Sequence, residues 1–384
     1  MPDKLTFTAG TNLPEIAEDV ASGIAMITRS VSPLLVYLGF PDDLVEAENV
    51  RHEWQEDALL PNSCVVVGPL LAGATTITVT PGTGTRMRIG DVLQVDGSQE
   101  LMIVTANVVA NSFDVTRGIR GTTAVGIANG AVIKRMNNPA VENETAPSAR
   151  PESRTRLANY TEIFRDVASV SRSAQKVKML NVADELAYQV MKKEKDLTRD
   201  VAHTVINGRM QTTNPEGTTV QPRTMHGIIP WILDGGDPVN VDALGAGLTE
   251  NLLKTAMQQC FERGGEPRAL AAHPTQRKRL SSLLEGRQRY TPEDNRLGSV
   301  VERVVTDFGE LDVLAPDIFI PSNVIMLLDG TKIRVAKLGS GPAWEEFDLA
   351  KTSLADSKEI VGEFTVEIKN AGDGGHGLIT NLAT

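Results

Sequence analysis

The sequence has few cysteines, few aromatic residues and no long apolar run, and each scarcity argues against a class of protein. Two of the 384 residues are cysteines, Cys64 and Cys260, which are too far apart to suggest a disulfide framework. We therefore expect two reduced thiols in a cytoplasmic setting. No stretch approaches the ~18 uninterrupted apolar residues of a membrane-spanning helix. The first 20 residues also lack the apolar core and cleavage site of a secretory signal.

Motifs for metal, cofactor or nucleophile chemistry are also lacking. The five histidines are scattered, and no CxxC, HExxH or DxDxDG spacing occurs, so we expect no metal site. The glycine-rich stretches 82–90 and 372–377 lack the strand–turn–helix context of a phosphate cradle, and we interpret both as turns. No GxSxG occurs either. We predict no catalytic, cofactor-binding or metal-binding residues, and a protein that is not an enzyme.

What is present is an ordinary globular composition with an acidic balance. Hydrophobic residues make up 41% and charged residues 23%, and the net charge is −11. This charge argues against affinity for nucleic acid through overall attraction. Aromatic residues, at 4%, do not support a stacking platform for single strands. The length predicts two or more hydrophobic cores.

The strongest local pattern is an amphipathic helix predicted over 182–207. Its apolar residues recur at spacings of four and seven, which is typical of one helical face. They are Val182, Leu186, Val190, Leu197, Val201 and Val205. We predict Asn181 as the N-cap and Gly208 as the stop. At ~1.5 Å per residue the helix would be ~40 Å long, which suits a structural backbone better than the wall of a catalytic cleft.

Composition changes between residues 62 and 137, where short β runs replace the helical period. Five or six runs rich in Val, Ile and Thr are separated by Gly, Asn and Asp turns. They predict a compact β-barrel or β-sandwich inserted into a larger unit. The segment 137–156 is the most linker-like part of the chain.

The remaining segments predict an α+β protein. Residues 14–30 form an amphipathic candidate, 49–60 is compatible with a strand or a short helix, and 157–171 is extended or β. After residue 223, helical patterns alternate with strands, and the last third is mostly strands joined by turns. Cys260 lies near the apolar face of one predicted helix, where it is most simply a small core residue.

The order of these elements resembles the major capsid protein of tailed bacteriophages, which has the Hong Kong 97-like fold. The stretches that carry the resemblance are NYTEIFRDVASVSRSAQKV, DELAYQVMKKEKDLTRDVAHTVING, GGEPRALAAHPTQRKRLSSL and VTDFGELDVLAPDIFIPSNVIMLLDGTKIRVAKL. The resemblance covers most of residues 30–384. It implies the subtype in which a β-domain is inserted into the long loop called the E-loop.

The resemblance also implies a division of the chain. The expected parts are an N-terminal arm (1–48), two E-loop limbs (49–61 and 138–168), an inserted β-domain (62–137), a peripheral domain with its spine helix (169–223 and 336–370, helix 182–207), and an axial domain (224–335 and 371–384). No Lys, Asn and Glu set is singled out for the covalent cross-link of the phage that names the fold, so the sequence does not lead us to predict a cross-link. The chain lacks a long charged helical extension, which leaves either a separate scaffolding protein or a processed chain.

Charged residues on the limbs and on the spine helix are the main candidates for contacts between subunits. The full set is Glu53, Trp54, Arg150, Arg154, Arg156, Lys192, Lys193 and Arg199. The chemistry behind the charged candidates is Arg–carboxylate pairing across subunits. A second basic cluster at 277–289 could equally contact phosphates or other subunits. For both basic clusters, a solvated surface is the competing interpretation.

The resemblance implies a shell-forming head protein whose partner is chiefly itself, as hexamers and pentamers around double-stranded DNA. It further implies scaffolding, portal and decoration proteins as partners, no membrane, and a location in the virion capsid after assembly in the host cytoplasm. Two alternatives stay open: another phage structural protein from the tail or portal, and an envelope-active hydrolase with a β binding module.

Overall fold

The computed structural model describes residues 31–57, 59–140, 142, 154–177, 182, 184–284, 302–351 and 353–384. The chain divides into two compact units, one made of Met1–Trp54 with Arg156–Thr384 and one of Gln55–Thr155. The amphipathic candidate 14–30 and much of the linker-like segment lie outside the described residues.

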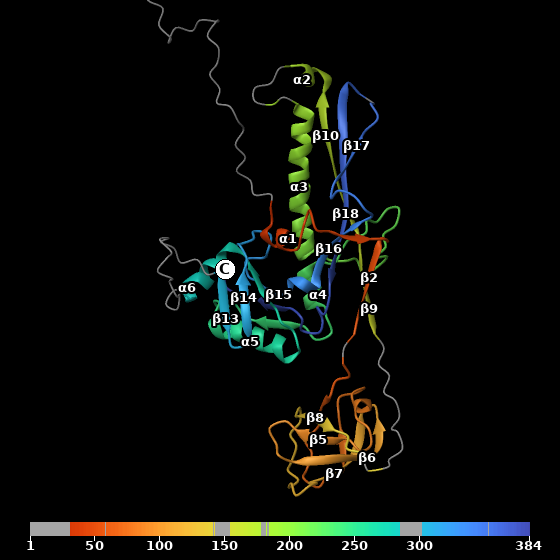
Figure 1. Cartoon of the computed structure of the whole chain (residues 1–384), viewed down its shortest axis with the longest axis vertical. Coiled ribbons are helices and arrows are strands. Elements are labelled where there is room, and N and C mark those ends of the chain that lie inside the picture. Colours follow the sequence, from red (N-terminus) through yellow and green to blue (C-terminus); the bar gives the residue numbers. More distant parts are fainter. Residues whose placement is uncertain are drawn as a thin grey trace, which may run out of the picture. The chain divides into compact units, whose positions relative to one another are not determined.

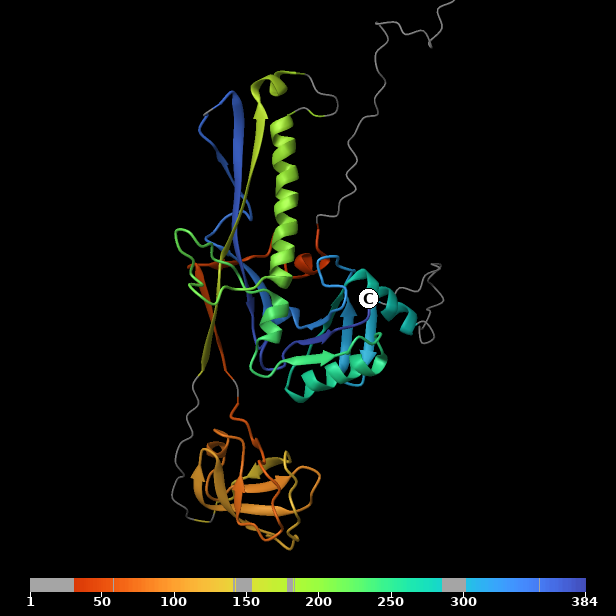
Figure 2. The same ribbon diagram turned by 180° about the vertical axis from the view of Figure 1, so that it is seen from behind.

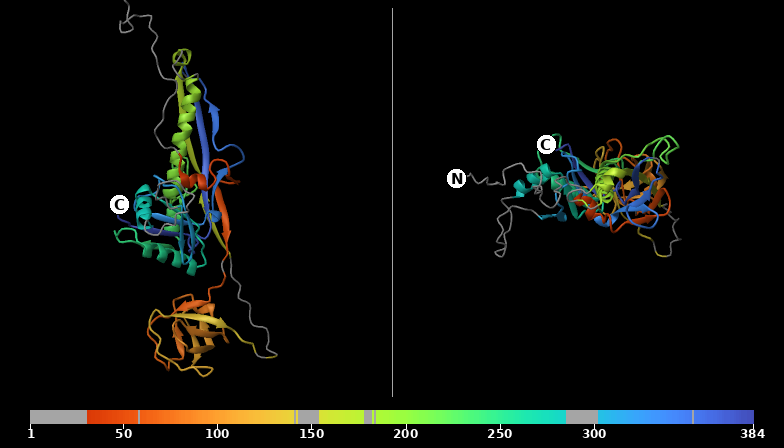
Figure 3. Two further views of the ribbon diagram at one scale, coloured as in Figure 1. Left: turned by 60° about the vertical axis from the view of Figure 1, so that its left-hand side comes forward. Right: turned by 90° about the horizontal axis from the view of Figure 1, so that it is seen from above.

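A long sheet and a long helix form one part of the larger unit. The sheet has the order β1-β16-β18-β10, and β17 also pairs with β18. Its strands are β1 (Val45–Ala47), β10 (Glu162–Ser171), β16 (Ile333–Leu338), β17 (Glu345–Asp348) and β18 (Ala355–Ile368). The antiparallel β10–β18 ladder runs the whole length of β10. Helix α3 (Glu185–Asn207) lies along these two strands (Figures 1 and 3).

The burial pattern of α3 confirms the predicted apolar face within the helix. Its buried residues are Val190, Leu197, Val201, Ala202, Val205 and Ile206. The predicted start is wrong, because the side chain of Asp184 caps the helix by accepting hydrogen bonds from the backbone N–H groups of Leu186 and Ala187. Val182 therefore precedes the helix. A carboxylate at the cap also interacts favourably with the helix dipole, which explains why the helix begins there.

Gly208 ends α3 as predicted, but for a different physical reason. Its φ of −56° is open to any residue, so no left-handed cap is formed. A Cβ at Gly208 would instead lie 2.5 Å from the carbonyl oxygen of Thr204. The backbone of Gly227 approaches the same point and donates a hydrogen bond of 2.8 Å to the carbonyl of Gly208. The glycine is therefore required by close backbone packing.

A second sheet of six strands forms the other part of the larger unit. Its order is β11-β19-β15-β12-β14-β13. The strands are β11 (Val239–Asp242), β12 (Ala269–Ala272), β13 (Arg303–Thr306), β14 (Gly309–Val313), β15 (Ile325–Leu328) and β19 (Gly377–Thr380). Helix α5 (Glu250–Glu262) packs against β11 and β19, and α6 (Pro274–Leu284) contacts β12 (Figure 2). Cys260 of α5 is fully buried, which confirms its predicted place in the core.

Several short elements lie outside the two large sheets. They are α1 (Pro33–Tyr37), β2 (Arg51–Glu56), β9 (Thr155–Tyr160), α2 (Arg172–Lys176), α4 (Ile228–Leu233) and the 3-10 turn η3 (Gly330–Lys332). Strands β2 and β9 pair as a two-stranded ladder, so segment 49–60 contains a strand and not a short helix. The turn at Asp329 joins β15 to β16, which belong to different sheets.

Two of the boundaries drawn from the sequence fall inside strands of the long sheet. The second limb was expected to run to residue 168, yet the chain from Glu162 onward pairs with β18. A new segment was expected at residue 336, but β16 already begins at Ile333. In both places the chain passes from one sheet to the next within a few residues, and the β pattern does not change there.

The smaller unit is a closed six-stranded barrel. Its strands are β3 (Ser63–Val65), β4 (Thr76–Thr78), β5 (Val92–Val95), β6 (Leu101–Val109), β7 (Ser112–Arg117) and β8 (Val132–Asn137), with the 3-10 turn η1 (Gly84–Arg86). The sheet order is β3-β8-β5-β6-β7-β4, and the bridge between Val66 and Val79 joins the two edges. Closure removes exposed strand edges and encloses a core that includes Ile77, Met102 and Phe113. Of the two predicted forms, the structure has the barrel.

Candidate assembly surfaces

The β2–β9 ladder carries the first group of predicted contact residues. Glu53 lies between two arginines, at 3.1 Å from Arg51 and 3.3 Å from Arg156. Arg154 forms a separate pair with Asp57 at 3.2 Å. The arginines are roughly half to two-thirds exposed. Exposed ion pairs of this kind stabilise a fold by only about 0–1 kcal/mol, so these charges can change partners at little cost.

A buried asparagine fixes the base of this ladder. The side-chain amide of Asn159, in β9, is fully buried and donates to the carbonyls of His226 (2.9 Å) and Val366 (2.8 Å). Its carbonyl oxygen accepts from the backbone N–H groups of His226 (2.9 Å) and Tyr160 (3.0 Å). One side chain thus connects β9, β18 and the segment before α4, with both its donors and its acceptor in use.

An aromatic cluster holds β2 at the same place. Trp54 is 5% exposed, and its ring lies 5.3 Å from that of Trp231 in α4. Trp231 in turn meets the ring of His226 edge-on at 5.1 Å. Burial lowers the pKa of His226 below its usual range, with the nearby Asp234 opposing the effect. Trp54 is therefore packed within its own subunit, unlike the exposed charges beyond it.

A hydrogen bond between side chains makes a further connection between β2 and the long sheet. His52 lies 2.9 Å from the carboxylate of Glu367 in β18, and both side chains are largely buried. Lys369 contacts the other oxygen of Glu367 at 2.8 Å. The hydrogen bond from His52, assisted by that from Lys369, lowers the pKa of Glu367 to about 2 against the opposing effect of burial. This carboxylate is therefore charged throughout the physiological range.

The charged residues predicted on the spine helix have different environments. Lys193 donates a hydrogen bond of 2.7 Å to Asp166 of β10, and this bond raises the pKa of the lysine and lowers that of the carboxyl. Arg199 is 3.7 Å from Asp196 in the same helix. Lys192 is exposed. Two of the three predicted cations thus already have partners within the subunit.

The second basic cluster is only partly a surface feature. Arg277 of α6 is half-buried, and this burial lowers the pKa of its guanidinium. Arg279 donates a hydrogen bond to the backbone carbonyl of Ala383, near the end of the chain. Residues 285–289 lie outside the described residues. Arg277 and Arg279 therefore pack on their own subunit, which argues against a free phosphate-binding surface in the described part of the cluster.

Exposed apolar side chains mark one surface of the six-stranded sheet region. Phe261 of α5 is 56% exposed, and its ring lies 5.9 Å from that of Phe308. Phe308 follows the edge strand β13, in which Val305 is 70% exposed. Clustered exposed apolar side chains are typical of a surface that another chain covers.

A second apolar surface lies on the long sheet. Ile163 and Val167 of β10 are exposed, and they alternate with Phe164 and Ala168, which are buried on the other face. The buried face is the one that α3 covers, because Phe164 and Ala168 share a core with the apolar residues of α3. The outer face of β10 therefore combines two exposed apolar side chains with Arg165 and Ser169, which are exposed on the same face.

The described residues contain no group of three or more His, Cys, Asp or Glu side chains that could hold a metal ion. Within the same part of the chain, no helix has the length and apolar character needed to cross a bilayer. Burial raises the pKa of the Cys64 thiol to about 11 and that of Cys260 to about 12, so neither is activated as a nucleophile.

Apart from Trp54, the residues that hold the ladder in place, namely Asn159, His52 and Glu367, were not predicted from the sequence. Asn159 had a recognisable signal, because asparagine is disfavoured in strands and its presence there calls for a specific hydrogen-bonding role. His52 and Glu367 had no such signal, since 315 residues separate them. Of the predicted candidates, the structure brings Glu53 and Arg156 together, while Arg150 lies outside the described residues.

Comparison with known proteins connects this geometry to a family. A family model described as SU10 major capsid protein matches residues 3–383. Among solved structures, the capsid of a native GTA particle is similar with a TM-score of 0.55 at 9% identity, covering 99% of this chain and 100% of that one. The capsid of an empty GTA particle gives 0.53 at 9% identity, with the same coverage.

A chain from Mycobacterium phage Adephagia is also similar, at 10% identity over 96% of this chain and 95% of that one, with a TM-score of 0.49. Among curated proteins, no relative matches. At such identities a solved structure speaks for the fold alone. The family match and the two GTA capsids together confirm the expected Hong Kong 97-like capsid fold.

Proposed function

The chain belongs to the SU10 major capsid protein family and forms a capsid shell, and from this premise we propose how its parts build that shell. A shell-forming protein associates with copies of itself. The proposed product is a closed icosahedral shell of hexamers and pentamers that encloses the double-stranded DNA of a tailed phage. The proposed role is structural and not catalytic.

We assign the parts by their sheets. The long sheet with α3 is the peripheral domain, and the six-stranded sheet with α5 and α6 is the axial domain. The β2–β9 ladder forms the two limbs of the E-loop, and the barrel is the inserted domain. The connectivity supports this division, because β2 leads into the barrel and β9 leads out of it.

The observation that supports the proposal is that each limb of the E-loop has a buried base and exposed ion pairs farther along. Their base is fixed by Asn159, Trp54 and the His52–Glu367 pair, all largely buried. Beyond that base come exposed ion pairs such as Arg154 with Asp57. A fixed base anchors the limb to its own subunit, and weakly held charges can be exchanged for those of a neighbour. Many weak contacts of this kind become strong collectively in a closed shell.

In the axial domain, the exposed apolar side chains of Phe261 and Val305 are the proposed contact with the next subunit of a capsomer. The position of β13 at the edge of the sheet, among the strands that the structure describes, supports this because an edge strand can pair with another chain. The spine-helix cation Lys192 is proposed to face a neighbour or the shell interior.

The proposed partners beyond the chain itself are scaffolding, portal and decoration proteins. The packaged DNA would be enclosed without sequence-specific binding. The net charge of −11 supports this, because an acidic shell repels the phosphate backbone and leaves the genome mobile. The proposed location is the virion capsid, after assembly in the host cytoplasm.

Electron microscopy of the expressed protein tests the proposal. Wild-type protein, alone or with a scaffolding protein, should form closed shells. Arg156→Glu should reduce shell yield about tenfold or more, because the lost contact recurs at every subunit, while the melting temperature of the unassembled chain changes little. Lys134→Glu, in a similarly exposed barrel pair with Asp96, is the matched control and should assemble normally.

Three outcomes would count against the proposal. Rings or tubes in place of closed shells would favour a tail or portal protein. A chain that stays monomeric under every assembly condition would contradict the shell itself. Equal shell yields for Arg156→Glu and wild type would show that the charges of the limbs do not contribute to assembly.

A further inference from the structure

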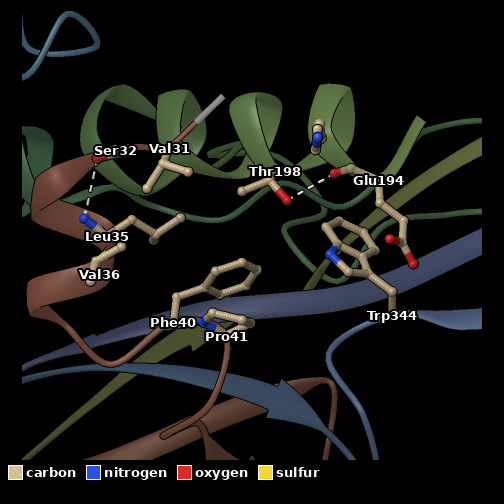
Figure 4. A pocket seen from close by; sticks show the side chains of 10 residues that line it. Val31, Ser32, Leu35, Val36, Phe40, Pro41, Glu194, Thr198 and Trp344 are labelled. Atoms are coloured by element: carbon tan, nitrogen blue, oxygen red, sulfur yellow. Dashed lines mark hydrogen bonds between the residues drawn. The ribbon is translucent and has the colours of Figure 1, made fainter. Parts of the chain in front are cut away.

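An open apolar groove of about 290 Å³ lies beside the start of the described chain (Figure 4). Its lining comes from α1 and the turn after it, from α3, and from the segment before β17. The lining residues are Val31, Ser32, Leu35, Val36, Phe40, Pro41, Glu194, Lys195, Thr198 and Trp344. Three elements that are distant in sequence therefore build one concave surface.

The groove presents apolar side chains that the described part of its own subunit does not cover. Phe40 is buried and meets the rings of Trp344 and Phe364 edge-on. Val31 and Val36, by contrast, are 58% and 54% exposed. Figure 4 shows Val36 on α1 and Val31 just before that helix, together with Thr198 and Glu194 of α3.

The side of the groove formed by α3 is polar but partly shielded from water. Burial, followed by the charge of Glu346, raises the pKa of Glu194. Lys195 stands at the same rim and forms no ion pair with the described residues. An occupant with an apolar stripe and a carboxylate placed beside Lys195, away from Glu194, would suit both sides.

Val31 and Ser32 lie at the rim of this groove, and Ser32 is held in place there. Asp317 is buried and accepts hydrogen bonds from the hydroxyl of Ser32, from the N–H of Leu34 (3.3 Å) and from the N–H of Phe319 (2.9 Å). Ser32 also caps α1 in an extended conformation. The segment that precedes Val31 is therefore joined to the chain at a fixed point beside the groove.

The sequence of that preceding segment has the required pattern. Apolar residues at helical spacing are Ile16, Val20, Ile24 and Ile27, and the acidic residues Glu15, Glu18 and Asp19 fall among them. The stripe ends at Ile27, only four residues before Val31, which already lines the groove.

We propose that residues 16–27 fold back and occupy the groove of their own subunit, with the apolar stripe on Val36 and Trp344 and an acidic side chain beside Lys195. The connection 28–31 is long enough to reverse direction, at ~3.3 Å per residue. A tether this short gives an effective concentration in roughly the millimolar range, which favours the subunit's own segment over that of another copy.

Cross-linking of the full-length, unassembled chain tests this inference. The variant Ile24→Cys with Val36→Cys is treated with a short bismaleimide at sub-micromolar protein. The native Cys64 and Cys260 are buried and do not compete. We expect an intrachain product with the mass of one chain, identified by peptide mapping.

The matched control pair is Ile24→Cys with Tyr37→Cys. Tyr37 is the next residue along α1 and is 43% exposed, so its tether and accessibility are similar. Its ring packs on Gly330 and does not line the groove. Random encounters within the tether would label both pairs alike, whereas a docked segment should favour the Val36 pair about threefold or more.

A disrupting substitution gives the second measurement. Adding Val20→Asp, on the stripe, should lower the yield of the Val36 pair to the control level. Adding Ser22→Asp, off the stripe, should leave the yield unchanged. Circular dichroism and the melting temperature check that each variant is folded.

Three results would overturn the inference. The first is a cross-link yield equal to that of the Tyr37 pair. The second is a product with the mass of two chains whose yield rises with protein concentration, which would assign the groove to the segment of another copy. The third is equal loss with Val20→Asp and Ser22→Asp. None of these outcomes depends on shell formation, so the inference fails or holds independently of the proposed function.

Discussion

Asn159→Asp should strongly destabilise the larger unit although it preserves the shape and volume of the side chain. The substitution replaces the amide nitrogen that donates to the carbonyls of His226 and Val366. A carboxylate oxygen would then face two buried carbonyl oxygens. A buried polar group without its partner costs about 1–3 kcal/mol, so two such groups give an expected loss of roughly 4 kcal/mol at neutral pH.

The pH dependence of this variant provides a second check. Burial beside carbonyl oxygens should raise the pKa of the introduced carboxyl in the folded state above its unfolded value of about 3.9. The folded variant therefore binds a proton more tightly than the unfolded one. The loss in the free energy of unfolding relative to wild type should be greatest near neutral pH, and it should become smaller as the pH falls through the raised pKa.

Urea unfolding followed by tryptophan fluorescence measures the effect on the larger unit alone. All three tryptophans, Trp54, Trp231 and Trp344, belong to that unit and none to the barrel. The matched control is Asn214→Asp, which makes the same charge change in an exposed loop. If the two variants differ by less than about 1 kcal/mol at neutral pH, the hydrogen bonds of Asn159 do not hold the limb as argued.

Two further predictions concern the core. Burial lowers the pKa of His376 in the folded state to about 4, whereas a histidine in the unfolded chain has a pKa of about 6.5. Between pH values of about 6.5 and about 4 the unfolded state therefore binds more protons than the folded state. The free energy of unfolding should fall by roughly 3 kcal/mol as the pH decreases over this range. His376→Gln should flatten this slope in thermal melts, whereas the exposed control His203→Gln should retain it. Leu197→Asp, which places a charge in the core beneath α3, should abolish soluble protein, while Lys192→Asp on the exposed face should leave yield and melting temperature unchanged. If the Leu197→Asp variant is soluble and assembles like wild type, α3 does not have the central role argued for it.

Local pattern was enough to place most helices and strands. The stripe from Val190 to Val205 located the spine helix, and the runs rich in Val, Ile and Thr located the barrel strands, because amphipathic periodicity follows directly from which residues are buried. The N-cap was misplaced because Asn181 and Asp184 are both good caps by residue type. Only the surrounding chain chooses between them.

The points at which the chain passes from one sheet to another could not be predicted from the sequence pattern. Strands β15 and β16 are both apolar and are separated by one turn, and nothing in their composition assigns them to different sheets. The same holds for β9 and β10, where only Thr161 lies between a limb strand and a strand of the long sheet. Strand pairing is decided by contacts across long sequence separations, which a local pattern does not contain.

The sequence by itself determined the fold class, the separate β unit, the spine helix and the capsid family, since each depends on local periodicity or on the order of elements. The tertiary structure alone decided which side chains act together. It joined His52 to Glu367, enclosed Asn159 between two carbonyls and brought Asp317 to Ser32. These contacts join residues that are far apart in the chain, so no local pattern contains them. Burial strengthens a hydrogen bond wherever the two partners meet in space, whatever their separation in sequence.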